Sequence, residues 1–187
     1  MDERGLIIAA LIGLGLYYWW TTQQPVDDTG GDSVDTGDDG TTGSTSPTPS
    51  NATDAQMVLA QTIYGEARGE TSDAQQGVAN VVMNRVADPF QFPAGLLGVA
   101  SVCQSPKQFS CWNPGDPNLA VITTVDTSDP VFQQCLNIAQ EATQGTLADL
   151  TGGATFYHDT SIATPSSWIA AGYVQTVQLD HLVFFRT

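Results

Sequence analysis

The tract from Thr21 to Thr53 limits what the rest of the chain can fold into. It consists mainly of Thr, Gly, Ser, Pro and Asp, and it contains no basic or aromatic residue. A segment of this composition buries too little apolar surface to offset the conformational entropy lost on folding. We therefore expect residues 21–53 to be a disordered linker, extended by repulsion among its aspartates. This leaves residues 54–187 as the globular domain and residues 1–20 as a separate segment.

Residues 5–20, GLIIAALIGLGLYYWW, are apolar and uncharged, and they end in aromatic residues of the kind that favour a membrane interface. At about 1.5 Å per residue a helix of this length reaches about 24 Å, whereas the hydrocarbon core measures about 30 Å. Spanning would therefore require local thinning of the bilayer. We predict an uncleaved membrane anchor at residues 1–20. A cleaved signal peptide is the alternative. It is disfavoured because Asp2 and Glu3 are acidic and because no A-x-A cleavage site follows the apolar run.

The charge pattern predicts the orientation of this anchor. Arg4 is the only cation near either end of the apolar segment, which favours a cytoplasmic N-terminus. We expect a single-pass membrane protein whose C-terminal domain is exported, to the periplasm or cell exterior, or displayed on a virion membrane if a phage encodes it.

The chain has 20 acidic and 5 basic residues, so its net charge is −15. The globular domain shares this excess, since its cations are only Arg68, Arg85, Lys107 and Arg186. So few basic residues cannot form a groove that follows nucleic-acid phosphates, which excludes a nucleic-acid partner. The acidity also argues against capture of anionic polymers by net charge, so we expect a substrate to be held by groove contacts.

Periodicity predicts a helix-rich α+β domain. Thr53 to Gln56 has the pattern of a capping box, and apolar residues then recur at helical spacing up to Gly69. A second box at Ser72 to Gln75 precedes a helix over residues 76–86, and a third helix is expected from Pro130 to Thr143 with Gly145 past its end. Residues 155–158 and 181–185 read as short strands that form a hairpin-like pair.

Two carboxylates stand out in the segment Ile63 to Glu70, IYGEARGE. Glu66 and Glu70 are four residues apart, so they share a face if the helix persists, and like charges at that spacing repel. The helix dipole is also unfavourable to a carboxylate near a C-terminus. Both effects suit a carboxyl group that has to donate a proton. Two exposed glutamates flanking a solvated Arg68 are the plain alternative.

Several separated blocks of the globular domain form an ordered set: AQTIYGEARGE (60–70), QQGVANVVMNRV (75–86), FP (92–93), QFS (108–110), ATFYH (154–158), PSSW (165–168) and HLVFFR (181–186). In this order they resemble the cell wall hydrolase family that includes the spore cortex-lytic enzymes. The resemblance covers residues 60–186.

The resemblance implies a lysozyme-like α+β fold and an enzyme that cleaves the glycan strands of peptidoglycan, with Glu66 as the catalytic acid. A lytic transglycosylase needs no second catalytic carboxylate, because the muramyl C6 hydroxyl attacks internally. A hydrolase must activate water with a second carboxylate, for which Glu70, Asp159 and Asp180 are candidates. We favour the transglycosylase. No cofactor is expected.

Other residues are expected to contact the substrate. Gln108, Phe109 and Ser110 lie in a loop rich in hydrogen-bonding groups, and Asn80 and Asn84 lie on one side of the second helix. By resemblance, Tyr157 and His158 lie on a strand near the cleft. His181 opens the last expected strand, from which it could reach the site, and Glu70 follows Glu66 by four residues. Each also has a structural reading, as a polar loop, a buried aromatic or a satisfied histidine.

The three cysteines, Cys103, Cys111 and Cys135, allow one disulfide in an exported domain. We predict the pair Cys103 and Cys111, which would brace the loop between them. No metal site is expected, since the spacing of the cysteines and of His158 and His181 matches no zinc motif.

Three functions are thus open: a membrane-tethered enzyme that cleaves peptidoglycan, a non-catalytic wall-binding module of the same fold, and a structural membrane or virion protein. A bacterial wall-remodelling enzyme and a phage protein that opens the wall have the same sequence features. Oligomeric state is not indicated.

Overall fold

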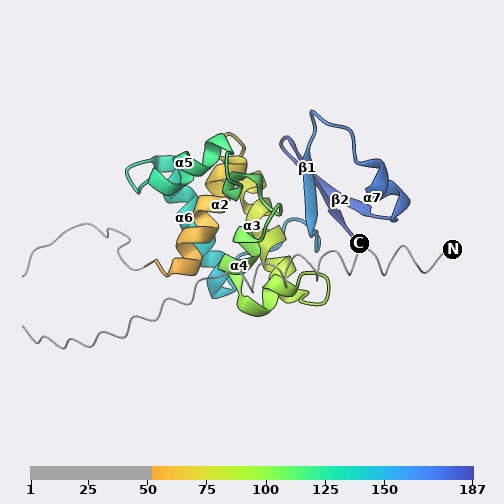
Figure 1. The fold of residues 1–187 in the computed structure, drawn as a ribbon, viewed down its shortest axis with the longest axis horizontal. Coiled ribbons are helices and arrows are strands. Elements are labelled where there is room, and N and C mark those ends of the chain that lie inside the picture. Colours follow the sequence, from red (N-terminus) through yellow and green to blue (C-terminus); the bar gives the residue numbers. More distant parts are fainter. Residues whose placement is uncertain (1–51) are drawn as a thin grey trace, which may run out of the picture. The chain divides into compact units, whose positions relative to one another are not determined.

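A computed structural model describes residues 52–187, so the predicted anchor at residues 1–20 and almost all of the predicted linker at residues 21–53 lie outside the described residues. Helices and strands are arranged in two parts, with most helices on one side and a small sheet on the other (Figure 1). The helices are α2 (Asp54–Ala67), α3 (Ser72–Ala87), α4 (Val99–Gln104), α5 (Pro117–Thr124), α6 (Pro130–Gln144) and α7 (Ser166–Ala170). Two 3₁₀ helices, η1 (Pro93–Leu97) and η2 (Ser110–Trp112), and three strands, β1 (Phe156–Asp159), β2 (Val174–Leu179) and β3 (Leu182–Arg186), complete the domain.

The predicted helix-rich domain with a small sheet is confirmed. Among residues 52–187, no helix is long and apolar enough to cross a bilayer.

Helix α2 is the centre of the helical part. It begins at the predicted capping box, in which the Thr53 hydroxyl and the Gln56 side chain each bond the other's backbone N–H. Its apolar residues, including Leu59 and Ile63, are fully buried. It packs against α6 and also against α3, α4 and α5. The helix ends at Ala67, slightly earlier than predicted, and this shorter end determines where the acidic residues of the IYGEARGE segment lie.

Helix α3 begins differently from the prediction. It starts at Ser72, and Thr71 at its N-cap makes no side-chain capping bond, so the predicted capping box at residues 72–75 is wrong. Gln75 instead turns its amide back to the end of α2, donating to the carbonyl oxygens of Ala67 and Glu70. The side chain that would have closed the box therefore fastens the turn between the two helices.

Helix α6 follows the prediction closely. Asp129 caps its N-terminus by accepting from the N–H groups of Val131 and Phe132, and Pro130 occupies the first turn. Gly145 ends the helix in the left-handed conformation, at φ 72°. The Tyr64 hydroxyl donates to the Asp129 carboxylate at 2.8 Å, which links α2 to this cap.

The sheet has the order β1-β3-β2, with both pairs antiparallel. The two predicted strands exist and pair, but they are not a hairpin, since β3 forms its hairpin with β2, which the sequence analysis missed. Leu182 to Phe185 of the central strand are all buried, as expected for an apolar run covered on both sides. Strand β2 lies at the edge and is largely exposed, and its glutamines give it no apolar signal.

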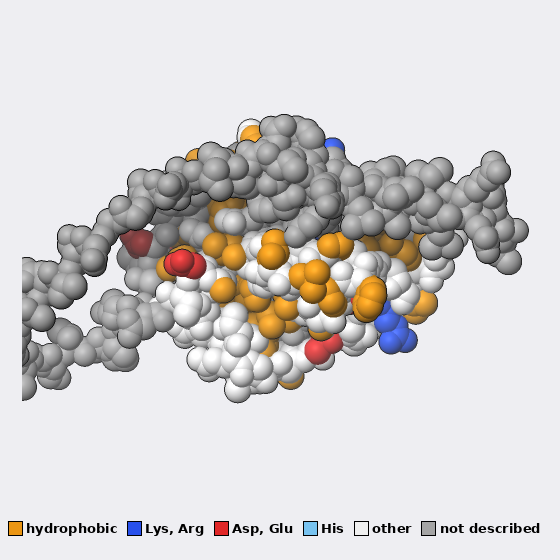
Figure 2. Space-filling view, turned by 60° about the horizontal axis from the view of Figure 1, so that its bottom comes forward, with side chains coloured by type: hydrophobic (Ala, Val, Ile, Leu, Met, Phe, Trp, Pro, Cys, Tyr) orange, Lys and Arg blue, Asp and Glu red, His pale blue; other side chains and the backbone are white. Residues whose placement is uncertain are grey.

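The surface carries few charged side chains on one face of the domain, where hydrophobic side chains lie among uncharged ones (Figure 2). The exposed large hydrophobic residues of the domain include Phe90, Leu96 and Ile169. They come from separate segments: Phe90 precedes η1, Leu96 lies in η1 and Ile169 lies in α7.

Helix α3 and the sheet meet at a glycine. A Cβ placed on Gly77 would lie 2.5 Å from Cζ of Phe184 and 3.2 Å from a methyl carbon of Leu179. Since Phe184 is fully buried in the central strand, it has no free space into which to move. The missing side chain therefore sets how closely α3 approaches the sheet.

We predict that Gly77→Ala lowers the free energy of unfolding by about 1–3 kcal/mol, because the overpacking cost exceeds the gain of up to about 1 kcal/mol in helix propensity. Denaturant unfolding measures this. Gly69→Ala is the control, since its Cβ would meet nothing within 4 Å and its φ is not positive. Equal denaturation midpoints for Gly77→Ala and Gly69→Ala would show that α3 does not pack closely against Phe184.

Candidate active site

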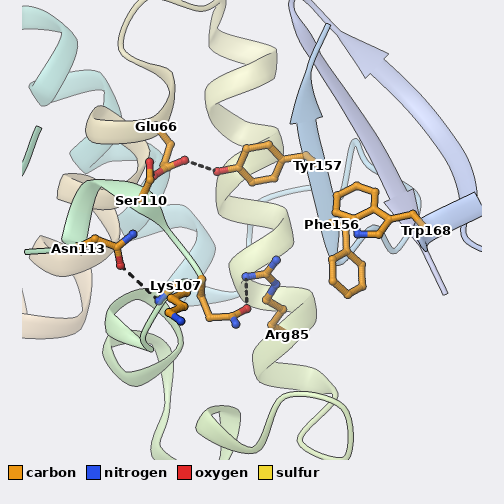
Figure 3. Close-up of a pocket in the computed structure, with 9 residues that line it drawn as sticks. Glu66, Arg85, Lys107, Ser110, Asn113, Phe156, Tyr157 and Trp168 are labelled. Atoms are coloured by element: carbon orange, nitrogen blue, oxygen red, sulfur yellow. Dashed lines mark hydrogen bonds between the residues drawn. The ribbon is translucent and has the colours of Figure 1, made fainter. Parts of the chain in front are cut away.

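A pocket of about 400 Å³ lies between the helical part and the sheet (Figure 3). Its lining comes from five parts of the chain: α2, α3, the loop around η2, β1 and α7. The lining residues are Glu66, Arg85, Lys107, Gln108, Ser110, Asn113, Phe156, Tyr157 and Trp168. Glu66 is the one carboxylate among them.

Both oxygens of the Glu66 carboxylate accept hydrogen bonds. Oε1 accepts from the backbone N–H of Cys111 at 3.1 Å and from the Ser110 hydroxyl at 3.3 Å. Oε2 accepts from the Tyr157 hydroxyl at 2.8 Å, across the pocket from the sheet (Figure 3). Donors from the helical side and from the sheet side thus hold the carboxylate in one orientation.

A glycine brings the Cys111 N–H within reach of Glu66. A Cβ placed on Gly65 would lie 2.6 Å from Cβ and 2.9 Å from Sγ of Cys111. Since Gly65 has no side chain, η2 packs directly on the last turn of α2. Cys111 is fully buried in this contact, so packing fixes the position of the N–H group that donates to Glu66.

Tyr157 remains a donor to Glu66 over a wide pH range. Burial raises its pKa well above the usual value of 10.0, and the charge of Glu66 and the hydrogen bond to it raise the pKa further. Nearby Arg85 acts in the opposite direction and lowers the pKa. The phenol is therefore neutral wherever an enzyme of ordinary pH range operates.

Arg85 is a buried cation at the base of the pocket. Its Nε donates to the carbonyl oxygen of Thr155 at 2.8 Å, and Nη1 donates to Oε1 of Gln108 at 3.2 Å. The guanidinium carbon also lies 5.0–5.6 Å from the ring centres of three phenylalanines, namely Phe92, Phe109 and Phe156. Burial lowers the pKa of Arg85, and the charges and rings around it favour the cation.

An aromatic wall closes the sheet side of the pocket. The Phe156 ring lies 5.3 Å from Trp168 and 4.7 Å from Tyr173, and Trp168 stacks on Tyr173 at 5.7 Å. Such a wall offers flat apolar surface next to the polar groups around Glu66. This combination suits a sugar ring, which has apolar faces and hydroxyl edges.

The structure brings together four of the predicted site residues: Glu66, Gln108, Ser110 and Tyr157 all line the pocket. Phe109 does not, because its ring is buried beneath the Arg85 guanidinium. It acts below the pocket as a support for the cation.

The prediction that Asn80 and Asn84 face the cleft does not agree with the structure. Asn80 donates to the carbonyl oxygen of Ala148 and accepts from the N–H of Leu150, and Asn84 donates to the carbonyl oxygen of Ala154. Both asparagines therefore fix the segment between α6 and β1. Neither lines the pocket.

His158 is also held away from the pocket lining. Its Nε2 lies 3.0 Å from the Thr164 hydroxyl, and its ring stacks on Phe185 at 5.3 Å. His158 secures the loop that leads to α7.

Glu70 does not share a face with Glu66, because α2 ends between them. Its Oε2 lies 3.1 Å from Nδ1 of His181 and accepts from the His181 N–H. Asp180 accepts from the N–H of Thr71, so the turn between β2 and β3 is fastened to the turn between α2 and α3. These three predicted residues are structural links outside the pocket.

Ligand atoms of Glu70, Asp180 and His181 all lie within 4.8 Å of one another, close enough to share one metal ion. Each already has a hydrogen-bond partner within the described residues, and two of the three are exposed. These hydrogen bonds explain why the three side chains lie close together.

Asp159, the remaining candidate for a second carboxylate, caps a turn. It accepts from the N–H of Ser161 at 2.7 Å, and this interaction with Ser161 lowers its pKa. It does not line the pocket either. The geometry therefore provides a single acid.

The predicted disulfide between Cys103 and Cys111 is absent, since all three cysteines are free and buried. Cys111 packs on Gly65, whereas Cys103 lies in α4 near the hydroxyl of Thr62. The small thiols fill separate close contacts with α2, and this packing role replaces the predicted covalent one.

Sequence reasoning missed Arg85, Lys107, Asn113 and Phe156 as parts of the pocket. A signal for Arg85 was present, because it continues the buried stripe of Val78, Val81 and Val82 at helical spacing. An arginine in such a stripe requires partners inside the fold. Lys107 and Asn113 had no comparable signal, since both lie in irregular loops.

We predict that Glu66→Gln lowers the pKa of Tyr157, because the substitution removes the negative charge that raises it, while burial keeps the pKa above 10.0. ¹³C NMR of labelled tyrosines, assigned with Tyr157→Phe, follows the titration. Tyr64, which bonds Asp129, is the internal control and should not move. An unchanged Tyr157 titration would contradict the contact with Glu66.

We predict that the pKa of His181 lies above 6.5 in the folded protein, chiefly through its bond to Glu70 and then through the charge of Asp180. The stabilisation is fully present below the unfolded pKa and is lost as pH rises through the folded pKa. Glu70→Gln should return the NMR titration of His181 toward 6.5. A His181 pKa at or below 6.5 in the unmodified protein would contradict the link.

Comparison with known proteins agrees with the fold and with the blocks of similarity. The Cell Wall Hydrolase family model matches residues 69–185, a range that starts just after Glu66. The spore cortex-lytic enzyme of Halalkalibacterium halodurans is 34% identical over 113 residues, which is 60% of this chain and 29% of that enzyme. The spore cortex-lytic enzyme of Bacillus subtilis is 48% identical over 42 residues, 22% of this chain and 13% of that enzyme. The chain thus matches less than a third of the length of either relative.

Two solved structures share the fold. The catalytic domain of the Bacillus cereus SleB protein is 24% identical with a TM-score of 0.52, covering 74% of this chain and 94% of that domain. The catalytic domain of the germination-specific lytic transglycosylase SleB from Bacillus anthracis is 26% identical, also with a TM-score of 0.52, covering 74% of this chain and all of that domain. The family match spans most of the described domain, and on it the chain belongs to the cell wall hydrolase family.

Proposed function

We propose that this protein cleaves the glycan strands of peptidoglycan as a lytic transglycosylase, with Glu66 as its catalytic residue. The observation that carries the proposal is that Glu66 is the one carboxylate lining the pocket and is held by three donors. A single acid suffices for internal transfer to a substrate hydroxyl, whereas hydrolysis requires a second group to activate water. The name of the Bacillus anthracis relative, a lytic transglycosylase, supports the same choice.

The contacts of Glu66 indicate which oxygen carries the proton. The Cys111 N–H on Oε1 can only donate, so the acid proton is disfavoured there. Oε2 faces the Tyr157 hydroxyl, which can accept from a protonated carboxyl and donate to an ionised one. In the protonated form of Glu66, Oε2 is therefore the oxygen that carries the proton.

In the first step the Oε2 proton passes to the glycosidic oxygen, and the bond from that oxygen to C1 of the muramyl residue breaks. Positive charge develops at C1 and the ring oxygen, and negative charge develops on Glu66, where the Ser110, Cys111 and Tyr157 donors stabilise it. In the second step the carboxylate takes the proton of the C6 hydroxyl, and O6 bonds to C1. The products are an anhydromuramyl end and a free 4-hydroxyl, and Glu66 is protonated again.

The other lining residues position the strand. Phe156 and Trp168 provide the surface on which a sugar ring stacks. The amides of Gln108 and Asn113 are placed to bond hydroxyl and acetamido groups. Residues 5–20 would hold the enzyme in a membrane, and residues 21–53 would let the exported domain reach the wall from there.

We predict that Glu66→Gln abolishes cleavage, with a loss of at least about 10³-fold, because no other carboxylate lines the pocket. Detergent-solubilised full-length protein is incubated with peptidoglycan, and soluble fragments are analysed by mass spectrometry for anhydromuramyl ends. Glu141→Gln, an exposed carboxylate on α6, is the matched control and should keep full activity.

Three outcomes decide among the functions. Anhydromuramyl ends that vanish only in Glu66→Gln support the transglycosylase. Reducing ends from the unmodified protein would replace it with a muramidase. No fragments from several wall types, together with strand binding, would point to a binding module.

A further inference from the structure

Positive charge is concentrated at the pocket, although the domain as a whole is acidic. The domain contains four basic residues, Arg68, Arg85, Lys107 and Arg186, and two of them line the pocket. When Glu66 is protonated, as the proposed reaction requires, the lining has two cations and no anion. This local field is opposite in sign to the net charge of the protein.

Arg85 has donors left over for a ligand. Its bonds to Thr155 and Gln108 use Nε and Nη1, and Nη2 has no partner among the described residues. Within residues 52–187 the only fully buried side-chain N or O atoms without a partner are Gln75 Oε1 and Thr155 Oγ1. Nη2 is therefore not fully buried, and Arg85 lines the pocket. A guanidinium fixed on one side and open on the other is suited to bind a carboxylate.

Lys107 lines the same pocket, and its backbone is fixed by the loop. Its backbone has φ 64°, which is uncommon for a residue other than glycine, and its N–H donates to Oδ1 of Asn113 at 3.4 Å. Its neighbour Gln108 bonds Arg85 directly. The Lys107 ammonium has no acidic partner among the described residues, and it lies on the lining with Arg85 (Figure 3).

We propose that Arg85 and Lys107 form a subsite for a carboxylate of the glycan strand bound at Glu66. The inference rests on the proposed function and adds a substrate preference to it. Two sources provide this chemistry: the lactyl carboxylate of a muramyl residue without peptide, and the carboxylates of an attached peptide. The net acidity of the domain opposes distant anions, so the subsite acts at contact range on a strand already placed in the pocket.

The test compares strands with free carboxylates and strands whose carboxylates are converted to amides with carbodiimide and ammonia. On peptide-free strands prepared with an amidase, we expect amidation to raise KM of the full-length protein about fivefold or more, with kcat within about twofold. Lys107→Gln should raise KM for the free-carboxylate strands to a similar extent and lose the discrimination. Arg186→Gln removes the same charge at an exposed site outside the pocket and should behave as the unmodified protein.

Peptide-bearing strands identify the source. Discrimination on peptide-free strands assigns the lactyl group, and discrimination only on peptide-bearing strands assigns the peptide, with either result supporting the subsite. Equal KM before and after amidation on both strands, together with an unchanged Lys107→Gln, would overturn it while leaving the proposed function intact.

If no turnover is observed, a binding measurement tests the carboxylate subsite separately from the transglycosylase activity. The Glu66→Gln variant is titrated with the same strands, and tryptophan fluorescence reports Kd, since Trp168 lines the pocket. Tighter binding of free-carboxylate strands, lost in the double variant with Lys107→Gln, supports the subsite even if the protein is not a transglycosylase. Equal Kd for both strands would overturn it.

Discussion

The geometry of the pocket depends on one buried cation. Arg85 extends from α3 and bonds the backbone just before β1 and the loop before η2, so one side chain sets the positions of three segments that are far apart in the sequence. Burying a guanidinium is costly unless its donors are satisfied, and here two carbonyl-type acceptors and three aromatic faces offset the cost. Tyr157 follows two residues after the Arg85-bound carbonyl, and Ser110 two residues after Gln108. The donors to Glu66 are therefore placed by the same side chain.

Glu66 links the helical part to the sheet. One carboxylate oxygen is bound from the η2 side and the other from β1, so its orientation depends on both parts being correctly packed. Two glycines permit that packing: Gly65 lets η2 lie on α2, and Gly77 lets α3 lie on Phe184. In each case the absence of a side chain brings backbone elements to the distance at which the polar groups meet.

The helices were predictable from the sequence because their signals are local. The box at Thr53, the Pro130 start and the Gly145 end of α6, and the apolar run of β3 all appear in the structure as predicted. Strand β2 was missed because an exposed edge strand that contains two glutamines and a threonine lacks an alternating apolar pattern. The false box at Ser72 failed because Gln75 found better acceptors at the end of α2, a contact that depends on the turn between the helices.

The site was only partly predictable, because local sequence patterns do not show which partner a polar side chain contacts. Glu66, Gln108, Ser110 and Tyr157 belong to blocks whose resemblance identified them, and all four line the pocket. For the asparagines and histidines the residue types alone could not decide between substrate and backbone partners. Asn80 and Asn84 bond the 148–154 segment, and the His158 ring lies within hydrogen-bond distance of Thr164, in the loop before α7. The asparagine contacts join residues 68 and 70 positions apart in the sequence, so no local pattern shows them.

The three buried thiols have a consequence for how the domain matures. Burial raises the pKa of Cys103 and Cys135 to about 12, and it raises the pKa of Cys111 as well. Only the thiolate reacts with oxidants and disulfides, so these cysteines are inert once the domain has folded. Folding does not wait for an oxidant, and exposure to an oxidising compartment leaves the native state chemically unchanged. A domain of this kind can cross from a reducing to an oxidising environment without needing thiol chemistry in either.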